Sequence, residues 1–109
     1  MIARTWHAQA LPEKADAYSA HFNESVVPAL KGLPGHRGAF LLRREIDGRV
    51  EFMAMTLWES RASIEAFAGK DIGRAHVEPE GRAALSTFDD FANHYEVAFT
   101  SFDAADKYP

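Results

Sequence analysis

VEFMAMTLWESRASIEAFAG, residues 50–69, decides the fold, because a strand pattern changes to a helix pattern within it. Up to residue 58, side chains sort onto two faces with a period of two, as in a strand. One face holds Phe52, Ala54, Thr56 and Trp58, and the other holds Met53, Met55 and Leu57. From the capping residue Ser60, the apolar residues Ile64, Phe67 and Ala68 follow helical spacing. Both faces of this strand are apolar, so both must be covered.

Further strands and helices are predicted on either side of this stretch. Strands are expected at residues 2–9, 36–45, 50–58 and 94–100. Helices are expected at residues 11–27, 60–69, 71–77 and 79–85. Pro28 should kink or end the first helix near Val27, and Asp47-Gly48 is a strong hairpin signal.

This order of elements predicts an α+β fold of the ferredoxin-like split βαβ type, with a four-stranded antiparallel sheet and helices on one face. Residues 1–100 are expected to form a single domain, and residues 101–109 a polar C-terminal tail. The helices cover only one face of the sheet. We therefore expect a homodimer to cover the other face, which should carry Met53, Met55, Leu57 and Leu41.

Composition excludes several classes of function. The chain has 109 residues, 47% of them hydrophobic, and a net charge of −4, which argues against nucleic acid as a partner. It has no cysteine, and its five histidines lack metal-ligand spacing, so no metal site is predicted. No apolar signal segment or membrane-spanning run is present, so no membrane association and a cytoplasmic location are expected.

Four local features together resemble the antibiotic-biosynthesis-monooxygenase family, whose members are small dimeric α/β barrels. These features are Pro34-Gly35, the Trp58-Glu59-Ser60 junction, the helix at 61–68 and His94-Tyr95-Glu96-Val97. The resemblance covers nearly the whole chain. It implies a dimeric α/β barrel with a substrate cavity between sheet and helices.

The resemblance also implies roles for individual residues. In members that oxidise polycyclic anthrones without a cofactor, the junction tryptophan lies in the substrate cavity, a role that falls on Trp58 here. Their asparagine, tyrosine and histidine are replaced by Ala54, Ile64 and Leu42. Residues expected to bind substrate are Trp6, Phe40, Phe52, Thr56, Trp58 and Phe67. His76 should rim the cavity as the catalytic residue, because an imidazole transfers protons near neutral pH.

Three hypotheses for function follow. The first is a cofactor-independent monooxygenase acting on a planar hydrophobic or quinol-like small molecule. The second is a non-catalytic ligand-binding or interaction module, which is favoured if Trp58 is enclosed with no adjoining void. The third is a heme-binding or heme-degrading protein with His76 as the iron ligand. Trp6 and Phe67 replace the asparagine and tryptophan of the heme-degrading branch, so weak heme binding and no turnover are expected. His21, beside the buried helix stripe, is expected to face water.

Overall fold

The computed structural model describes residues 1–102, and all but the first two residues of the predicted 101–109 tail lie outside them. Its strands are β1 (Ile2–Ala10), β2 (His36–Ile46), β3 (Arg49–Trp58), β4 (Thr87–Phe88) and β5 (Asn93–Glu96). Its helical segments are α1 (Pro12–His21), η1 (Phe22–Val26), α2 (Val27–Lys31), α3 (Arg61–Ala68) and α4 (Pro79–Ala84). No helix among residues 1–102 is long and apolar enough to cross a bilayer.

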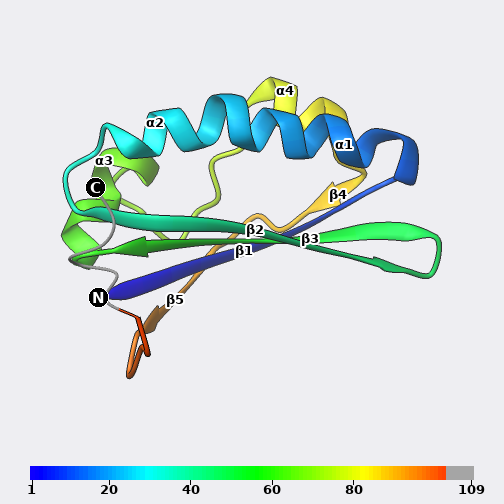
Figure 1. Cartoon of the computed structure of the whole chain (residues 1–109). Helices are drawn as coiled ribbons and strands as arrows, with labels where there is room; N and C mark the ends of the chain where they lie inside the picture. The colour runs from blue at the N-terminus through cyan, green and yellow to red at the C-terminus, as the bar shows by residue number, and fades with distance from the viewer. Residues whose placement is uncertain (103–109) are drawn as a thin grey trace.

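The strands form one antiparallel sheet in the order β2-β3-β1-β4, and β5 also pairs with β1. All the helices lie on one face of this sheet (Figure 1). The predicted α+β, ferredoxin-like architecture is therefore confirmed. The last strand, expected at 94–100, is shorter and covers 93–96 as β5. The additional short strand β4, which was not predicted, also pairs with β1 and brings the sheet to five strands.

Local signals in the sequence set several element ends. Ser60 and Ser63 form a capping box at the start of α3, and Gly69, at a φ of 82°, ends the helix. Asp47 and Gly48 both have positive φ, 50° and 73°, as a tight hairpin turn between β2 and β3 requires. The expected helix at 71–77 is wrong, because that segment is irregular and runs across the sheet to α4.

The long helix does not end at Val27, which was one of the two effects predicted for Pro28. It widens instead into the π-helical turn η1, in which the Val27 amide donates to the Phe22 carbonyl five residues earlier. A π turn absorbs one extra residue per turn, so the helix continues through α2. Proline lies in the first turn of α2, where its missing amide hydrogen is tolerated.

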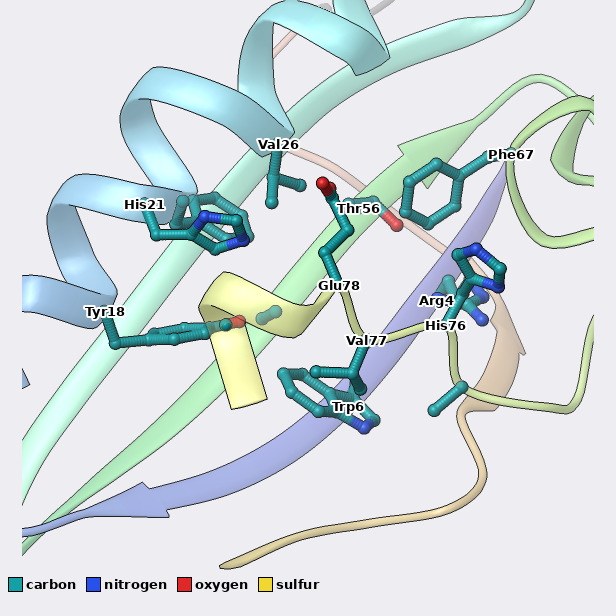
Figure 2. Close-up of a pocket in the computed structure, with 14 residues that line it drawn as sticks. Arg4, Trp6, Tyr18, His21, Val26, Thr56, Phe67, His76, Val77 and Glu78 are labelled. Atoms are coloured by element: carbon teal, nitrogen blue, oxygen red, sulfur yellow. The ribbon is translucent and has the colours of Figure 1, made fainter. Parts of the chain in front are cut away.

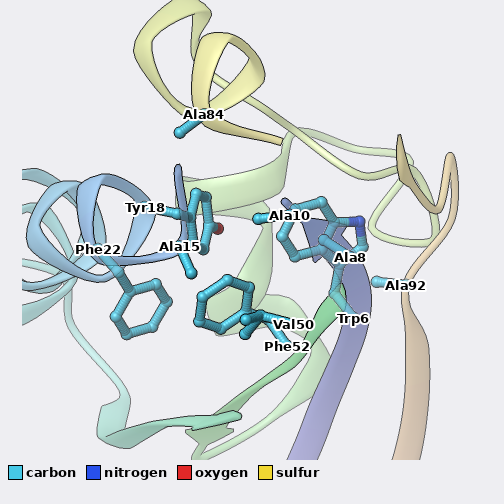
Figure 3. Packing of buried hydrophobic residues seen from close by; sticks show 10 residues of the cluster. All are labelled: Trp6, Ala8, Ala10, Ala15, Tyr18, Phe22, Val50, Phe52, Ala84 and Ala92. Atoms are coloured by element: carbon cyan, nitrogen blue, oxygen red, sulfur yellow. The ribbon is translucent and has the colours of Figure 1, made fainter. Parts of the chain in front are cut away.

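The core lies between the helices and the inner face of the sheet in two clusters. Figure 3 shows the larger one, in which Phe52 lies beneath Tyr18, with ring centroids 5.1 Å apart. The smaller cluster joins Trp58 to Ile2, Leu30 and Ile64. The helical stripe and the inner face of β3 thus pack as their spacing predicts.

The outer face of the sheet carries no helix (Figure 1). Met53 pairs with Leu42 and Met55 with Phe40, so these four apolar side chains share that face. The expectation that Leu41 lies there is wrong, because it packs against the larger core cluster. The cause is a β-bulge at His36–Gly38, which shifts the register and reverses the alternation of faces along β2.

Candidate functional site

A cavity of about 70 Å³ lies between the inner face of the sheet and the helices (Figure 2). The central strands β1 and β3 supply Arg4, Trp6, Ala54 and Thr56. The long helix supplies Tyr18, His21, Phe22 and Val26. The remaining wall and rim comprise Phe67, Gly81 and the segment at residues 75–78. The lining is predominantly apolar with a few polar groups, as is typical of small-molecule sites.

The π turn allows residues from successive turns of the helix to face the cavity. Tyr18, Phe22 and Val26 follow one another at four-residue intervals, and all three line the cavity. A regular α-helix advances 100° per residue, so this stripe would drift around the helix without the wider turn. Turns of this kind are frequent at functional sites.

The indole ring of Trp6 faces the cavity, and its N–H group is hydrogen-bonded outside the cavity. Its Nε1 donates to the Asp89 carbonyl at 2.7 Å, and the residue is only 9% exposed. The ring lies tilted against Tyr18, with centroids 6.4 Å apart. Burial raises the pKa of the Tyr18 phenol to about 12, so this hydroxyl keeps its proton at ordinary pH.

Four of the residues predicted for the site line the cavity together: Trp6, Thr56, Phe67 and His76. His76 is exposed at the rim, and Figure 2 shows it at the same end of the cavity as Phe67, which comes from α3. The period-2 patterns of β1 and β3 were sufficient to place the two strand residues, because both face the helices.

The other three predicted residues do not line the cavity. Phe40 is 46% exposed on the outer face of the sheet, because the β2 bulge turns it away from the helices. Phe52 lies on the inner face but is fully enclosed beneath Tyr18 and Phe22 in the larger core cluster. Trp58, likewise fully enclosed, belongs to the smaller cluster near the end of β3.

Trp58 stands behind the cavity wall. Its Nε1 donates to Thr56 Oγ1 at 2.8 Å, and its ring centroid lies 6.0 Å from that of Phe67. His36 lies edge-on to the same indole, at 5.1 Å between centroids. Trp58 therefore fixes the position of two lining side chains without facing the void itself. It is enclosed, but the void adjoins the two side chains that it contacts, so the condition that favours the non-catalytic module is only half met.

The predicted site residues left out five polar or aromatic lining residues: Arg4, Tyr18, His21, Phe22 and Glu78. The side chain of His21 is only 8% exposed and lies against α4, where its Nδ1 is 3.7 Å from a Glu80 carboxylate oxygen. The expectation that it faces water is therefore wrong. For Arg4 a signal was available, since it lies between Ile2 and Trp6 on the inner face of β1.

Arg4 places a positive charge at this end of the cavity. His94 lies opposite Arg4 in the pairing of β1 with β5. Burial lowers the pKa of His94, and the positive charges of Arg4 and Arg61 lower it further. Within residues 1–102 there is no cluster of three or more His, Asp or Glu side chains suited to holding a metal ion.

The family model described as antibiotic biosynthesis monooxygenase matches residues 1–79. The chain belongs to this family. The match includes β1, β3, α3 and the rim segment, and so nearly all of the cavity lining of this antibiotic biosynthesis monooxygenase family member.

A solved structure supports the fold. The chain resembles a Bacillus cereus protein, provisionally assigned as an antibiotic biosynthesis monooxygenase, with a TM-score of 0.64 and 16% identity, covering 94% of this chain and 96% of that one. A Chloroflexus aurantiacus J-10-fl protein with the same provisional assignment aligns at a TM-score of 0.47 and 15% identity, covering 86% and 89% of the two chains. No curated protein sequence matches this chain.

Proposed function

We propose that this family member is a cofactor-independent monooxygenase acting on a small planar, quinol-like or anthrone-like molecule. The observation that carries the proposal is the cavity, which is enclosed by aromatic and aliphatic side chains and holds few polar groups. Such a site excludes water and orients a planar ring against Trp6 and Phe67.

The proposed reaction requires a base and molecular oxygen. The base removes a proton from an activated C–H bond of the substrate, and the carbon's electron pair then forms a C–O bond with oxygen. The resulting hydroperoxide loses water to leave a carbonyl group, so one oxygen atom enters the product and the other enters water. His76, exposed at the rim, is the proposed base, and the more enclosed His21 is the alternative.

The cavity volume favours a compact substrate. At about 70 Å³ it is roughly half the volume of an engineered apolar cavity that binds benzene. Even a single ring therefore requires some outward movement of the wall, and an anthrone requires more. The irregular rim segment at residues 75–78 is the proposed place for this movement, since its backbone belongs to no helix or strand.

Heme fits this site poorly. His76 is a chemically suitable axial ligand. The cavity, however, is several-fold smaller than the roughly 300–1,000 Å³ typical of cofactor sites. The side chains of Trp6 and Phe67 occupy the space that a porphyrin would need. We therefore propose no role for heme. Tight hemin binding that is lost in His76→Ala, with consumption of heme under reductant and oxygen, would overturn this view.

We further propose that the protein acts as a homodimer. The outer sheet face, defined here as Phe40, Leu42, Met53, Met55 and Leu57, is apolar and carries no helix. Phe40 and Leu42 are 46% and 47% exposed. A second copy packed face to face would cover this surface economically.

Oxygen uptake tests the proposed activity. Methylhydroquinone and anthrone are offered to the native protein with a chelator present, and uptake is compared with the rate in buffer alone. We expect uptake above that background, and one labelled oxygen atom in the product when ¹⁸O₂ is used. His76→Gln should reduce the rate by about 10²-fold or more while changing binding little. His7→Gln, an exposed histidine on the outer side of β1, is the matched control.

Each negative outcome has a consequence. Saturable quenching of tryptophan fluorescence without oxygen uptake favours the non-catalytic ligand-binding alternative. Loss of activity in His21→Gln but not in His76→Gln moves the base to the helix. No binding and no uptake with either compound contradict the proposal as a whole.

A further inference from the structure

Arg4 is the most unusual polar residue in the cavity. It lies on the central strand β1 and is only 7% exposed. Its Nη2 donates to two backbone carbonyls, those of Arg74 at 3.1 Å and Ile72 at 3.4 Å, and its Nε is buried without an acceptor. No carboxylate within residues 1–102 lies within ion-pair distance of it.

The surface arginines of β2 show what Arg4 lacks. Arg37, Arg43 and Arg44 each form an ion pair with a carboxylate, at 3.1, 3.0 and 2.8 Å. Exposed pairs of this kind contribute little to stability. A buried cation without a counter-charge is costly, and burial lowers the pKa of Arg4 accordingly. The folded protein therefore bears a cost at Arg4 that a bound anion would offset.

The surroundings of Arg4 suit an aromatic anion. Its guanidinium lies over the Phe67 ring, 5.6 Å from the centroid. The Trp6 indole lies further along the same face of β1, and Figure 2 shows both rings at the cavity. His94, across from Arg4, also has a buried nitrogen, Nε2, without a partner. An apolar slot with a positive end thus matches a planar ring that carries a negatively charged oxygen.

We propose that Arg4 receives the anionic oxygen of a planar aromatic ligand, either a ring carboxylate or an ionised ring hydroxyl. This inference rests on the proposed function in so far as the ligand is the substrate. The guanidinium would hold the charged oxygen while the ring lies against Trp6 and Phe67. For a quinol-like substrate, Arg4 favours the ionised hydroxyl and so makes the ring more electron-rich.

Matched probes test this assignment. Benzoate and benzamide have nearly the same shape and differ in charge, and both are titrated calorimetrically into the native protein. We expect benzoate to bind about tenfold more tightly or better, as a charge-assisted contact predicts. Binding of an ionised ring hydroxyl is tested with 4-nitrophenol, whose anion absorbs visible light. Binding to the protein should lower the apparent pKa of 4-nitrophenol by about one unit.

Variants assign the effect to Arg4. Arg4→Met keeps a long unbranched side chain without the charge, and it should abolish both the preference for benzoate and the shift of 4-nitrophenol. Arg43→Met is the matched control, because Arg43 also lies over a phenylalanine ring, Phe52, at 5.6 Å, but on the surface and paired with Asp16. The Arg43→Met variant should keep the preference for benzoate over benzamide.

A readout on the native protein does not depend on any variant folding. An anion on Arg4 cancels part of the positive field at His94, so saturating benzoate should raise the pKa of His94 measured by NMR. Three results would each overturn the assignment: equal affinity for benzoate and benzamide together with no pKa shift of 4-nitrophenol, no binding of any probe, or an anion preference that survives in folded Arg4→Met. An effect with 4-nitrophenol alone, or with benzoate alone, identifies the source of the charged oxygen.

The proposed function and this inference fail in different ways. Anion binding that depends on Arg4, without oxygen uptake from any substrate, refutes the oxygenase activity and leaves the anion site standing. Oxygen uptake that is unchanged in Arg4→Met, together with no charge preference, refutes the anion site and leaves the activity standing.

Discussion

Replacing Thr56 by Val should destabilise the protein although nearly the same volume is retained. Thr56 Oγ1 accepts a hydrogen bond at 2.8 Å from Trp58 Nε1, and Trp58 is fully enclosed. Valine fills the site but cannot accept, so a buried indole N–H is left unpaired. Such a group costs about 1–3 kcal/mol, a large part of the roughly 5–15 kcal/mol that stabilises an ordinary domain.

Equilibrium urea unfolding at fixed protein concentration measures this cost. With a slope of about 1–2 kcal/mol/M for a domain of this size, the midpoint should fall by roughly 0.5–3 M. Thr56→Ser keeps the acceptor and should retain most of the stability. Thr87→Val, at an exposed position on β4, is the matched control and should change the midpoint little.

A double-mutant cycle isolates the hydrogen bond. In a Trp58→Phe background the donor is already gone, so Thr56→Val should cost much less than in the native protein. If Thr56→Val changes the free energy of unfolding by less than about 0.5 kcal/mol, as surface substitutions do, the indole N–H has another acceptor or water, and the reasoning fails.

Three other predictions concern assembly, backbone conformation and pH. Sedimentation equilibrium should show a native mass of twice the chain, and Met55→Glu should dissociate or unfold this proposed dimer. Ala83→Glu, at an exposed position on α4, is the control and should leave the mass unchanged. A monomeric native protein contradicts the model. Gly35→Ala should cost more stability in urea than Gly48→Ala, because both have positive φ but only at Gly35 would a Cβ lie 2.5 Å from another side chain; equal costs contradict this. Burial lowers the pKa of His36 from 6.5, so its contribution to stability is full above that pH and is lost as pH falls toward the folded-state pKa. Unfolding at about pH 7.5 and 5.5 should therefore show a smaller loss in His36→Phe than in the native protein, and an equal loss contradicts the assignment.

The sequence predicted the parts of the fold that depend on short-range rules. Ser60 and Gly69 mark the ends of α3, and Asp47-Gly48 forms the hairpin, because caps and tight turns need particular residues wherever they occur. The two faces of β3 could be assigned by simple alternation of residues, because that strand is regular throughout.

Errors arose where one irregular residue changed a longer pattern. The bulge near His36 reversed the faces of β2, so Phe40 was predicted for the cavity although it lies outside. Gly38, at the bulge, was the one available signal, because a glycine inside a strand often marks a bulge. The burial of His21 depends on α4, which packs against it from a distant part of the chain, and local spacing carries no such information.

Arg4 was missed for a different reason. A charged residue within a strand is ordinarily read as solvent-facing, because burial without a partner is costly. Its alternation with Ile2 and Trp6 indicated the opposite. Where hydropathy and periodicity disagree about a charged side chain, the disagreement itself is a useful signal for a ligand site.

The π turn at Phe22–Val26 contains one residue more than a regular α-helical turn, and the orientation of the rest of the helix depends on that residue. Deleting the exposed residue Glu24 would shorten the chain there and allow a regular α-helix to form. Everything downstream would then rotate by about 100° about the helix axis, relative to Tyr18. Leu30 would turn out of the core, and Val26 out of the cavity. The extra residue thus sets the rotation between the two halves of the helix. The first half faces the ligand cavity and the second half faces the core, and their sequences can change independently.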